Sequence, residues 1–267
     1  MNSFEKLGKP IVVASHRRSG THLTIDLLRK QFEECKSTKK FGERLNRLYL
    51  TLNDVGPDHK QYVSPKEALR ILSKSERPIV KTHQLPSFEG TSFIKELVHW
   101  LNEEADFLYL VRDGRRVMTS LHLYEQSFNE NARVDFSEFI RLPSIDDQAY
   151  NNVKWWAYHV ESWMQQSNVK VLKYEDIVKE MHQILEILGE YLKMKPLYHT
   201  PLLPQRVKNI WQGRWNRLLK TVPESTAIIG YYKGQKTPKW QEAFQGDDYH
   251  FFLKEAGEVM HRLGYSV

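Results

Sequence analysis

The chain has 267 residues, of which 40% are hydrophobic, enough for a sizeable core in one domain spanning residues 1–267. Lys and Arg exceed Asp and Glu by 39 to 33, which suits an anionic partner without identifying it. The single cysteine, Cys35, excludes an intramolecular disulfide and a thiolate metal cage. With no secretory signal and no apolar run of about 20 residues, we expect a cytoplasmic protein without a membrane partner.

Four short apolar runs are typical of buried parallel strands, and each ends in a polar or charged cluster. The runs are residues 10–15, 78–83, 106–113 and 169–176. Apolar residues recur at helical spacing in residues 22–35, 92–104, 151–167 and 181–194. This alternation predicts βαβ units and a parallel sheet. Ligands of such sheets bind at the carboxyl ends of the strands, so the polar clusters should share one cleft, which residues 36–77 and 122–150 could roof.

The first polar cluster, residues 15–22, has the shape of a phosphate-binding loop. Gly20 lets the chain approach a phosphate closely, and the N–H groups that begin the next helix would face the anion. Further donors are Arg18, Ser19, Thr21 and His22. The pattern G-x-x-x-x-G-K-[ST] is not met and its Mg²⁺-binding hydroxyl is missing, so this loop does not require a metal. An ordinary strand-to-helix turn with surface arginines is the alternative.

Two more clusters supply candidate catalytic and binding groups. Lys81 and His83 are two residues apart, so they point the same way if the strand persists. A histidine beside a lysine resists protonation and stays available as a base near neutral pH. Arg112 ends the third strand and Ser120 follows in a helix, so the two could close on one phosphate. Taken alone, each cluster also fits an ordinary surface or capping role.

Five motifs in this order resemble the sulfotransferases that use 3′-phosphoadenosine 5′-phosphosulfate (PAPS). The motifs are SHRRSGTHL, KTHQLP, VRDGRRVMTS, LKYEDI and YYKGQKTPKW, and the resemblance covers residues 11–244. It is to the soluble, cytosolic-type branch, and it implies a P-loop-like three-layer α/β/α fold with a central parallel sheet. It also implies PAPS as cofactor, 3′,5′-ADP as product and charge supplied by Arg and Lys without a metal.

The resemblance implies a role for each matching residue. His83 would be the general base, Lys81 would stabilise the sulfuryl group, and Arg18 would contact the bridging oxygen and that group. The 5′-phosphosulfate end would be held by Arg17, Arg18, Ser19, Gly20, Thr21 and His22. The 3′-phosphate would contact Arg112, Ser120, Lys233 and Gly234, and Tyr174 would line the adenosine region.

The chain departs from the family pattern at several positions. Arg17 replaces the loop proline, and Leu23 replaces a tryptophan expected to stack on adenine. Tyr232 stands where the family has the arginine before Lys-Gly, which removes one cation from the 3′-phosphate. Arg116, at the position of a family aspartate, could compensate.

The acceptor pocket is less well defined by the sequence. Candidate walls are Tyr49, Tyr124, Trp155, Trp156, Tyr158, Trp163, Trp211 and Trp215, of which Trp155, Tyr158 and Trp163 also fit the buried face of a helix. The carboxylates Glu125, Asp146 and Asp147 would suit a cationic acceptor, or else are solvated loop charges.

We expect tailoring of a small natural product as in bacteria, with a guanidinium alkaloid of the saxitoxin type as one specific case. Sulfation of an oligosaccharide is the alternative within the class. A P-loop kinase using ATP–Mg²⁺ and a basic nucleic-acid-binding module are the alternatives from other classes, and a homodimer stays open. We expect no nucleic-acid partner, because the aromatics follow helical patterns rather than a nucleic-acid-binding sheet.

Overall fold

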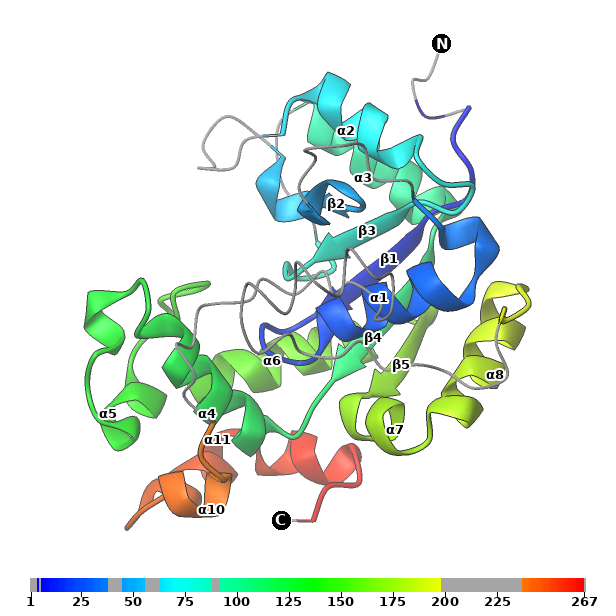
Figure 1. The fold of residues 1–267 in the computed structure, drawn as a ribbon. Coiled ribbons are helices and arrows are strands. Elements are labelled where there is room, and N and C mark those ends of the chain that lie inside the picture. Colours follow the sequence, from blue (N-terminus) through cyan, green and yellow to red (C-terminus); the bar gives the residue numbers. More distant parts are fainter. Residues whose placement is uncertain are drawn as a thin grey trace, which may run out of the picture.

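A computed structural model describes residues 4, 6–37, 45–55, 63–87, 92–197 and 237–266. In this part of the chain five parallel strands form one sheet in the order β2–β3–β1–β4–β5 (Figure 1). The strands are β1 (Ile11–Ser15), β2 (Leu50–Thr51), β3 (Ile79–Thr82), β4 (Asp106–Val111) and β5 (Val169–Lys173). The predicted parallel sheet is confirmed, and β2 is an additional edge strand.

Helices cover both faces of this sheet, which confirms the three-layer α/β/α architecture. One face carries α1 (Thr21–Gln31), α7 (Tyr174–Lys179) and α8 (Met181–Leu192). The other face carries α2 (Pro65–Leu72), α3 (Ser92–Glu104), α4 (Gly114–Glu125), α6 (Asn152–Met164) and α11 (Asp248–Arg262). Figure 1 shows α1 in front of the sheet and α6 behind it. Alternate residues of β1 enter the two cores, as the period of a strand requires.

The remaining elements are short. They are α5 (Phe136–Arg141), α10 (Trp240–Ala243), η1 (Glu33–Cys35), η2 (Leu45–Arg47), η3 (Leu52–Asp54) and η4 (Glu130–Ala132). In the described ranges no helix is long and apolar enough to cross a membrane.

The helix predicted over residues 22–35 is wrong in its last four residues. Helix α1 ends at Gln31 because Phe32 adopts an extended backbone with φ −128° and ψ 126°, and η1 follows. Phe32 and Cys35 both lie in the core beneath α1. Their spacing of three also fits one face of a helix, which is why the sequence pattern does not reveal this break.

The carboxyl ends of three strands meet at one edge of the sheet. Ala14 of β1 pairs with Thr82 of β3, and Ser15 pairs with Leu110 of β4. The segments that follow these strands therefore start side by side, as the sequence predicts. Residues 36–77 were expected to roof this edge. Part of this segment extends the sheet, because β2 pairs with β3, and η3 follows β2 directly.

Candidate active site

The loop between β1 and α1 is curled by two left-handed residues, Arg18 with φ 68° and Gly20 with φ 104°. A Cβ atom at Gly20 would lie 2.4 Å from Cδ2 of Tyr174, so this position requires glycine for both space and conformation. Left-handed backbone is unfavourable for Arg18 by about 1 kcal/mol. Its carbonyl accepts a hydrogen bond from Arg112 Nη1 at 3.0 Å, which supports the strained turn.

The start of α1 presents hydrogen-bond donors and no acidic side chain in its first turn. The first helical bond runs from Thr24 N–H to the Gly20 carbonyl, so the N–H groups before Thr24 lie outside the helical ladder. Ser19 is fully buried, and its hydroxyl has no hydrogen-bond partner among the described residues. A buried unsatisfied hydroxyl, a glycine cradle and a helix N-terminus together fit a phosphate or phosphosulfate group.

Arg18, Ser120 and Arg112 come together beside this loop, although they arise from three different elements. Arg18 Nε donates to Ser120 Oγ at 3.1 Å, and the Arg18 guanidinium lies 5.1 Å from the centre of the Tyr124 ring. The Arg112 guanidinium lies over the Tyr174 ring at 4.5 Å. The predicted anion-binding side chains are thus neighbours, with Tyr174 at the start of α7 beside them.

Lys81 lies on β3 next to Val13 of β1 and faces the same side of the sheet as α1. Burial is the main cause that lowers the pKa of Lys81 to about 8. The charges of Arg17 and Arg18 lower it further, while Asp54 opposes the shift. At neutral pH the lysine is a cation that is poorly solvated, so an incoming anion would stabilise it strongly.

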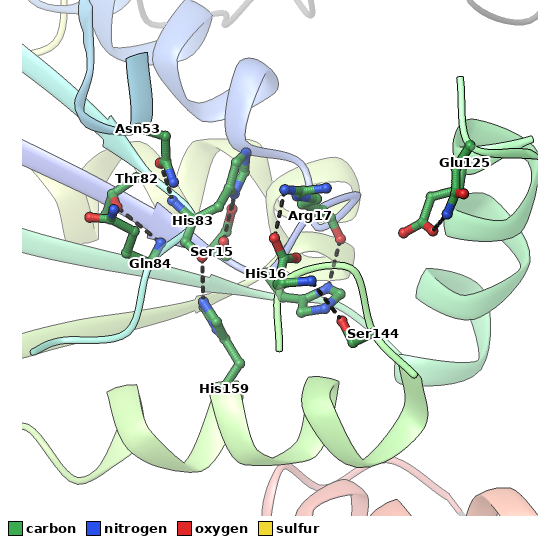
Figure 2. Close-up of polar contacts among 12 residues, drawn as sticks. Ser15, His16, Arg17, Asn53, Thr82, His83, Gln84, Glu125, Ser144 and His159 are labelled. Atoms are coloured by element: carbon green, nitrogen blue, oxygen red, sulfur yellow. Dashed lines mark hydrogen bonds and ion pairs between the residues drawn. The ribbon is translucent and has the colours of Figure 1, made fainter. Parts of the chain in front are cut away.

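His83 is held at three points by three different elements (Figure 2). Its Nδ1 lies 2.7 Å from the Ser15 carbonyl oxygen, its backbone N–H donates to Asn53 Oδ1 at 3.1 Å, and its carbonyl lies 3.1 Å from His159 Nε2. A carbonyl oxygen only accepts, so the proton of neutral His83 is on Nδ1 and the lone pair is on Nε2. His83 therefore presents Nε2 as its basic atom.

The condition under which Lys81 and His83 would point the same way is not met, because β3 ends at Thr82, one residue before His83. The three contacts of His83, rather than the strand pleat, set its orientation. The prediction that His83 resists protonation agrees with its pKa, which lies well below the ordinary value. Burial is the main cause and the Lys81 charge comes second, while the Ser15 carbonyl opposes the shift.

Two further histidines lie next to this group. His159 is fully buried on α6 and its Nδ1 is 2.9 Å from the Tyr109 hydroxyl. His16 is also buried, donates from Nδ1 to the Arg17 carbonyl at 2.9 Å, and meets the His159 ring edge-on. Burial is the main cause that lowers the pKa of both, to about 4 for His159.

Acid should destabilise the fold through these buried histidines. Their folded-state pKa values lie below the unfolded value of about 6.5, so the stabilisation is present above pH 6.5 and is lost as the pH falls below it. Each contributes a slope of about 1.4 kcal/mol per pH unit to the free energy of unfolding. Urea titrations at pH 7.5, 6.5 and 5.5 measure this slope. The variant His159→Gln should have a slope that is smaller by the contribution of one histidine, about 1.4 kcal/mol per pH unit. An unchanged slope in that variant would mean that His159 is already charged in the fold.

Arg17, predicted to contact the donor, forms an ion pair with Asp146 at 2.6 Å. Asp146 is therefore not a solvated loop charge. Glu125 is buried and accepts a hydrogen bond from Asn129 Nδ2 at 3.3 Å, while Asp147 accepts from the Ala149 N–H in a surface turn. This ion pair connects the segment before α6 to the loop between β1 and α1.

The aromatic candidates divide into core and site residues. Trp156 and Trp163 belong to the core between the sheet and α6, so they are not pocket walls. Trp155 is 6.0 Å from the His159 ring, and exposed Tyr158 stacks on Tyr150 with centroids 5.1 Å apart. The other two described candidates, Tyr49 and Tyr124, lie beside His22 and Arg18.

The other predicted residues are placed as follows. His22 is in the first turn of α1, and burial, followed by the charges of Lys81 and Arg18, lowers its pKa to about 3. Thr21 Oγ1 lies 2.6 Å from Ser15 Oγ. Arg116 is exposed on α4. Outside the described residues lie Lys233, Gly234, Tyr232, Trp211 and Trp215.

Sequence reasoning missed three residues around the base: Asn53, Tyr109 and His159. Asn53 has no local signal, because it reaches His83 only through the pairing of β2 with β3. His159 does have a local signal in the sequence. It lies four residues from both Trp155 and Trp163, so it is the polar member of a buried stripe on α6. A histidine on such a stripe requires buried partners.

The chain matches the family described as the sulfotransferase domain over residues 9–264. It therefore belongs to the sulfotransferase family, and it is an enzyme of that class. No curated protein matches the chain in sequence.

Solved structures support the same fold. Retinol dehydratase with androsterone and the inactive cofactor PAP is 18% identical, with a TM-score of 0.55, over 97% of this chain and 82% of that one. Mouse sulfotransferase SULT7A1 with PAP is 16% identical, with a TM-score of 0.55, over 97% and 87%. The sulfotransferase domain of the Synechococcus PCC 7002 olefin synthase is 13% identical, with a TM-score of 0.52, over 100% and 98%.

Proposed function

We propose that this sulfotransferase moves the sulfuryl group of PAPS, in line, to a hydroxyl or amine of a small-molecule acceptor. The observation that carries the proposal is the meeting of a neutral base with a cationic anion-binding loop. His83 bonds through Nδ1 to Ser15, the last residue before that loop. The PAP complexes of retinol dehydratase and mouse SULT7A1 support PAPS as the donor, because PAP is the nucleotide that remains after sulfuryl transfer.

Bound PAPS supplies the electrophilic sulfur and a phosphate leaving group. On the protein side, His83 Nε2 takes the proton of the acceptor O–H or N–H as the new bond to sulfur forms. Arg18 and Lys81 provide positive charge where negative charge grows on the leaving oxygen. Ser19, Thr21 and the first N–H groups of α1 would hold the 5′-phosphate.

We assign the 3′-phosphate to Ser120 and Arg112, which contact the side chain and the backbone carbonyl of Arg18, respectively. Arg112 offers a planar fork of donors that matches a phosphate, and the Ser120 hydroxyl adds a neutral donor. In this arrangement the Tyr174 ring beneath Arg112 would border the adenosine.

A small natural product is the acceptor class we favour. Aromatic side chains near the base support it, since Trp155 lies against His159 and the Tyr150–Tyr158 stack adjoins Trp155. The androsterone complex of retinol dehydratase and the olefin synthase domain, both of this fold, agree with small-molecule chemistry. An acceptor panel of simple phenols, alcohols, amines and oligosaccharides would separate this class from carbohydrate sulfation.

Thermal melting with nucleotides tests the donor. At about 100 times its dissociation constant a ligand adds roughly 2.7 kcal/mol, which raises the midpoint by several degrees. We expect this shift with 3′,5′-ADP, little with 5′-AMP, and none with ATP–Mg²⁺. Arg112→Ala should weaken the 3′,5′-ADP shift and leave 5′-AMP unchanged, whereas Arg133→Ala, on an exposed arginine, should change neither. A shift with ATP–Mg²⁺ alone would overturn PAPS as the donor.

A further inference from the structure

We propose that His159 is a positioning residue for the base: through its Nε2–H it holds the backbone carbonyl of His83, and Tyr109 fixes its tautomer. The inference rests on the proposed role of His83. It concerns groups that contact the backbone of His83 rather than its imidazole.

The hydrogen bonds define one protonation pattern for the pair of histidines. The His83 carbonyl accepts, so His159 Nε2 carries the proton and lies 3.1 Å from that oxygen. His159 Nδ1 then carries the lone pair and accepts from the Tyr109 hydroxyl at 2.9 Å. Both ring nitrogens of His159 are thus used in buried bonds, which excludes it as the base itself.

Aromatic packing keeps this support rigid. The Tyr109 ring stacks on Trp163 at 5.6 Å and 11° and on His159 at 5.8 Å and 30°. Trp163 Nε1 donates to the Gln84 carbonyl at 3.0 Å. Helix α6 therefore holds two consecutive carbonyls, those of His83 and Gln84, where the chain leaves β3.

This support matters because the strand does not orient His83. Within the described residues the side chain of the base is held at Nδ1 alone, so the direction of Nε2 depends on where the backbone of residue 83 lies. Asn53 holds the N–H on one side and His159 holds the carbonyl on the other. Displacement of a catalytic group by about 1 Å can cost roughly 10²-fold in rate.

The test compares His159→Leu, His159→Gln and Tyr109→Phe with the parent enzyme. We expect His159→Leu to lower kcat by about 10- to 100-fold with KM for PAPS unchanged. His159→Gln keeps a donor at the Nε2 position and should recover most of kcat. Tyr109→Phe keeps the ring stack, loses only the hydroxyl, and should lower kcat several-fold. The acceptor is whichever simple phenol, alcohol or amine the parent turns over fastest.

The matched control is Tyr191→Phe. The Tyr191 hydroxyl bonds to the backbone carbonyls of Phe107 and Asn168, at the amino end of β4 and away from His83. Loss of this hydroxyl should leave kcat unchanged. If kcat falls equally in Tyr109→Phe and Tyr191→Phe, or if His159→Leu keeps kcat within twofold, the positioning role is refuted.

Nitrogen-15 NMR of the histidine side chains gives a readout that needs no acceptor. In the parent protein His83 should show a protonated Nδ1 and an unprotonated Nε2, with its signals assigned by their loss in His83→Ala. In His159→Leu the His83 signals should average between tautomers, and in His159→Gln they should not. Unchanged His83 signals in His159→Leu would overturn the proposal. Full activity of His83→Ala would refute the base itself, which is a separate failure.

Discussion

His83→Ala is expected to lower kcat by roughly two to four orders of magnitude, the usual contribution of a general base. The variant removes an imidazole whose Nε2 is left basic because its Nδ1 is bonded to the Ser15 carbonyl. Binding of 3′,5′-ADP should persist, because the loop and Arg112 are untouched. Turnover of PAPS with the best simple acceptor and thermal melting with 3′,5′-ADP measure the two effects separately.

His83→Asn serves as the control for shape, because its amide can still donate to the Ser15 carbonyl from the Nδ1 position but cannot take up a proton. It should be as inactive as His83→Ala and more stable. Activity close to that of the parent in either variant would show that another group, or water, accepts the proton.

Lys81→Met is the second change with a large expected effect, a loss of about 10²- to 10³-fold in kcat, as for removal of a charge-stabilising donor in a desolvated site. The pH profile provides its signature. Because the pKa of Lys81 is lowered to about 8, its charge is lost as the pH rises, and kcat/KM for PAPS should fall above pH 8 in the parent enzyme. No fall is expected near pH 6.5, since the pKa of His83 lies well below that value.

Lys81→Arg separates charge from protonation, because arginine stays charged throughout this range. It should retain part of the activity and lose the decline above pH 8. A decline that persists in Lys81→Arg would assign it to another group.

The sequence predicts strands β1, β3, β4 and β5 but not the edge strand β2. The predicted runs 10–15, 78–83 and 106–113 are rich in apolar residues, and they match β1, β3 and β4 to within two residues at each end. Strand β2 has two residues, too few for any periodicity. Helix α2 was missed although Ser64 and Pro65 form a helix start, with the Ser64 hydroxyl accepting from the Glu67 N–H.

The site shows the same division. Motif order indicated His83, Arg112 and Ser120, and the structure brings Arg112 and Ser120 together around Arg18. The motifs do not predict the tautomer of His83, because it depends on a contact with the Ser15 carbonyl, which is far away in the sequence. The pairing of Arg17 with Asp146 was equally hidden, because 129 residues separate the two side chains.

Strand order has a consequence for how such an enzyme can change. Strand β1 is central, with the proposed base on its β3 side and Arg112 on its β4 side. The proposed proton transfer and the proposed 3′-phosphate contact thus depend on opposite flanks of a single strand. Substitutions around His83 should alter proton removal while sparing recognition of the 3′-phosphate, so the two properties can evolve, or be engineered, separately.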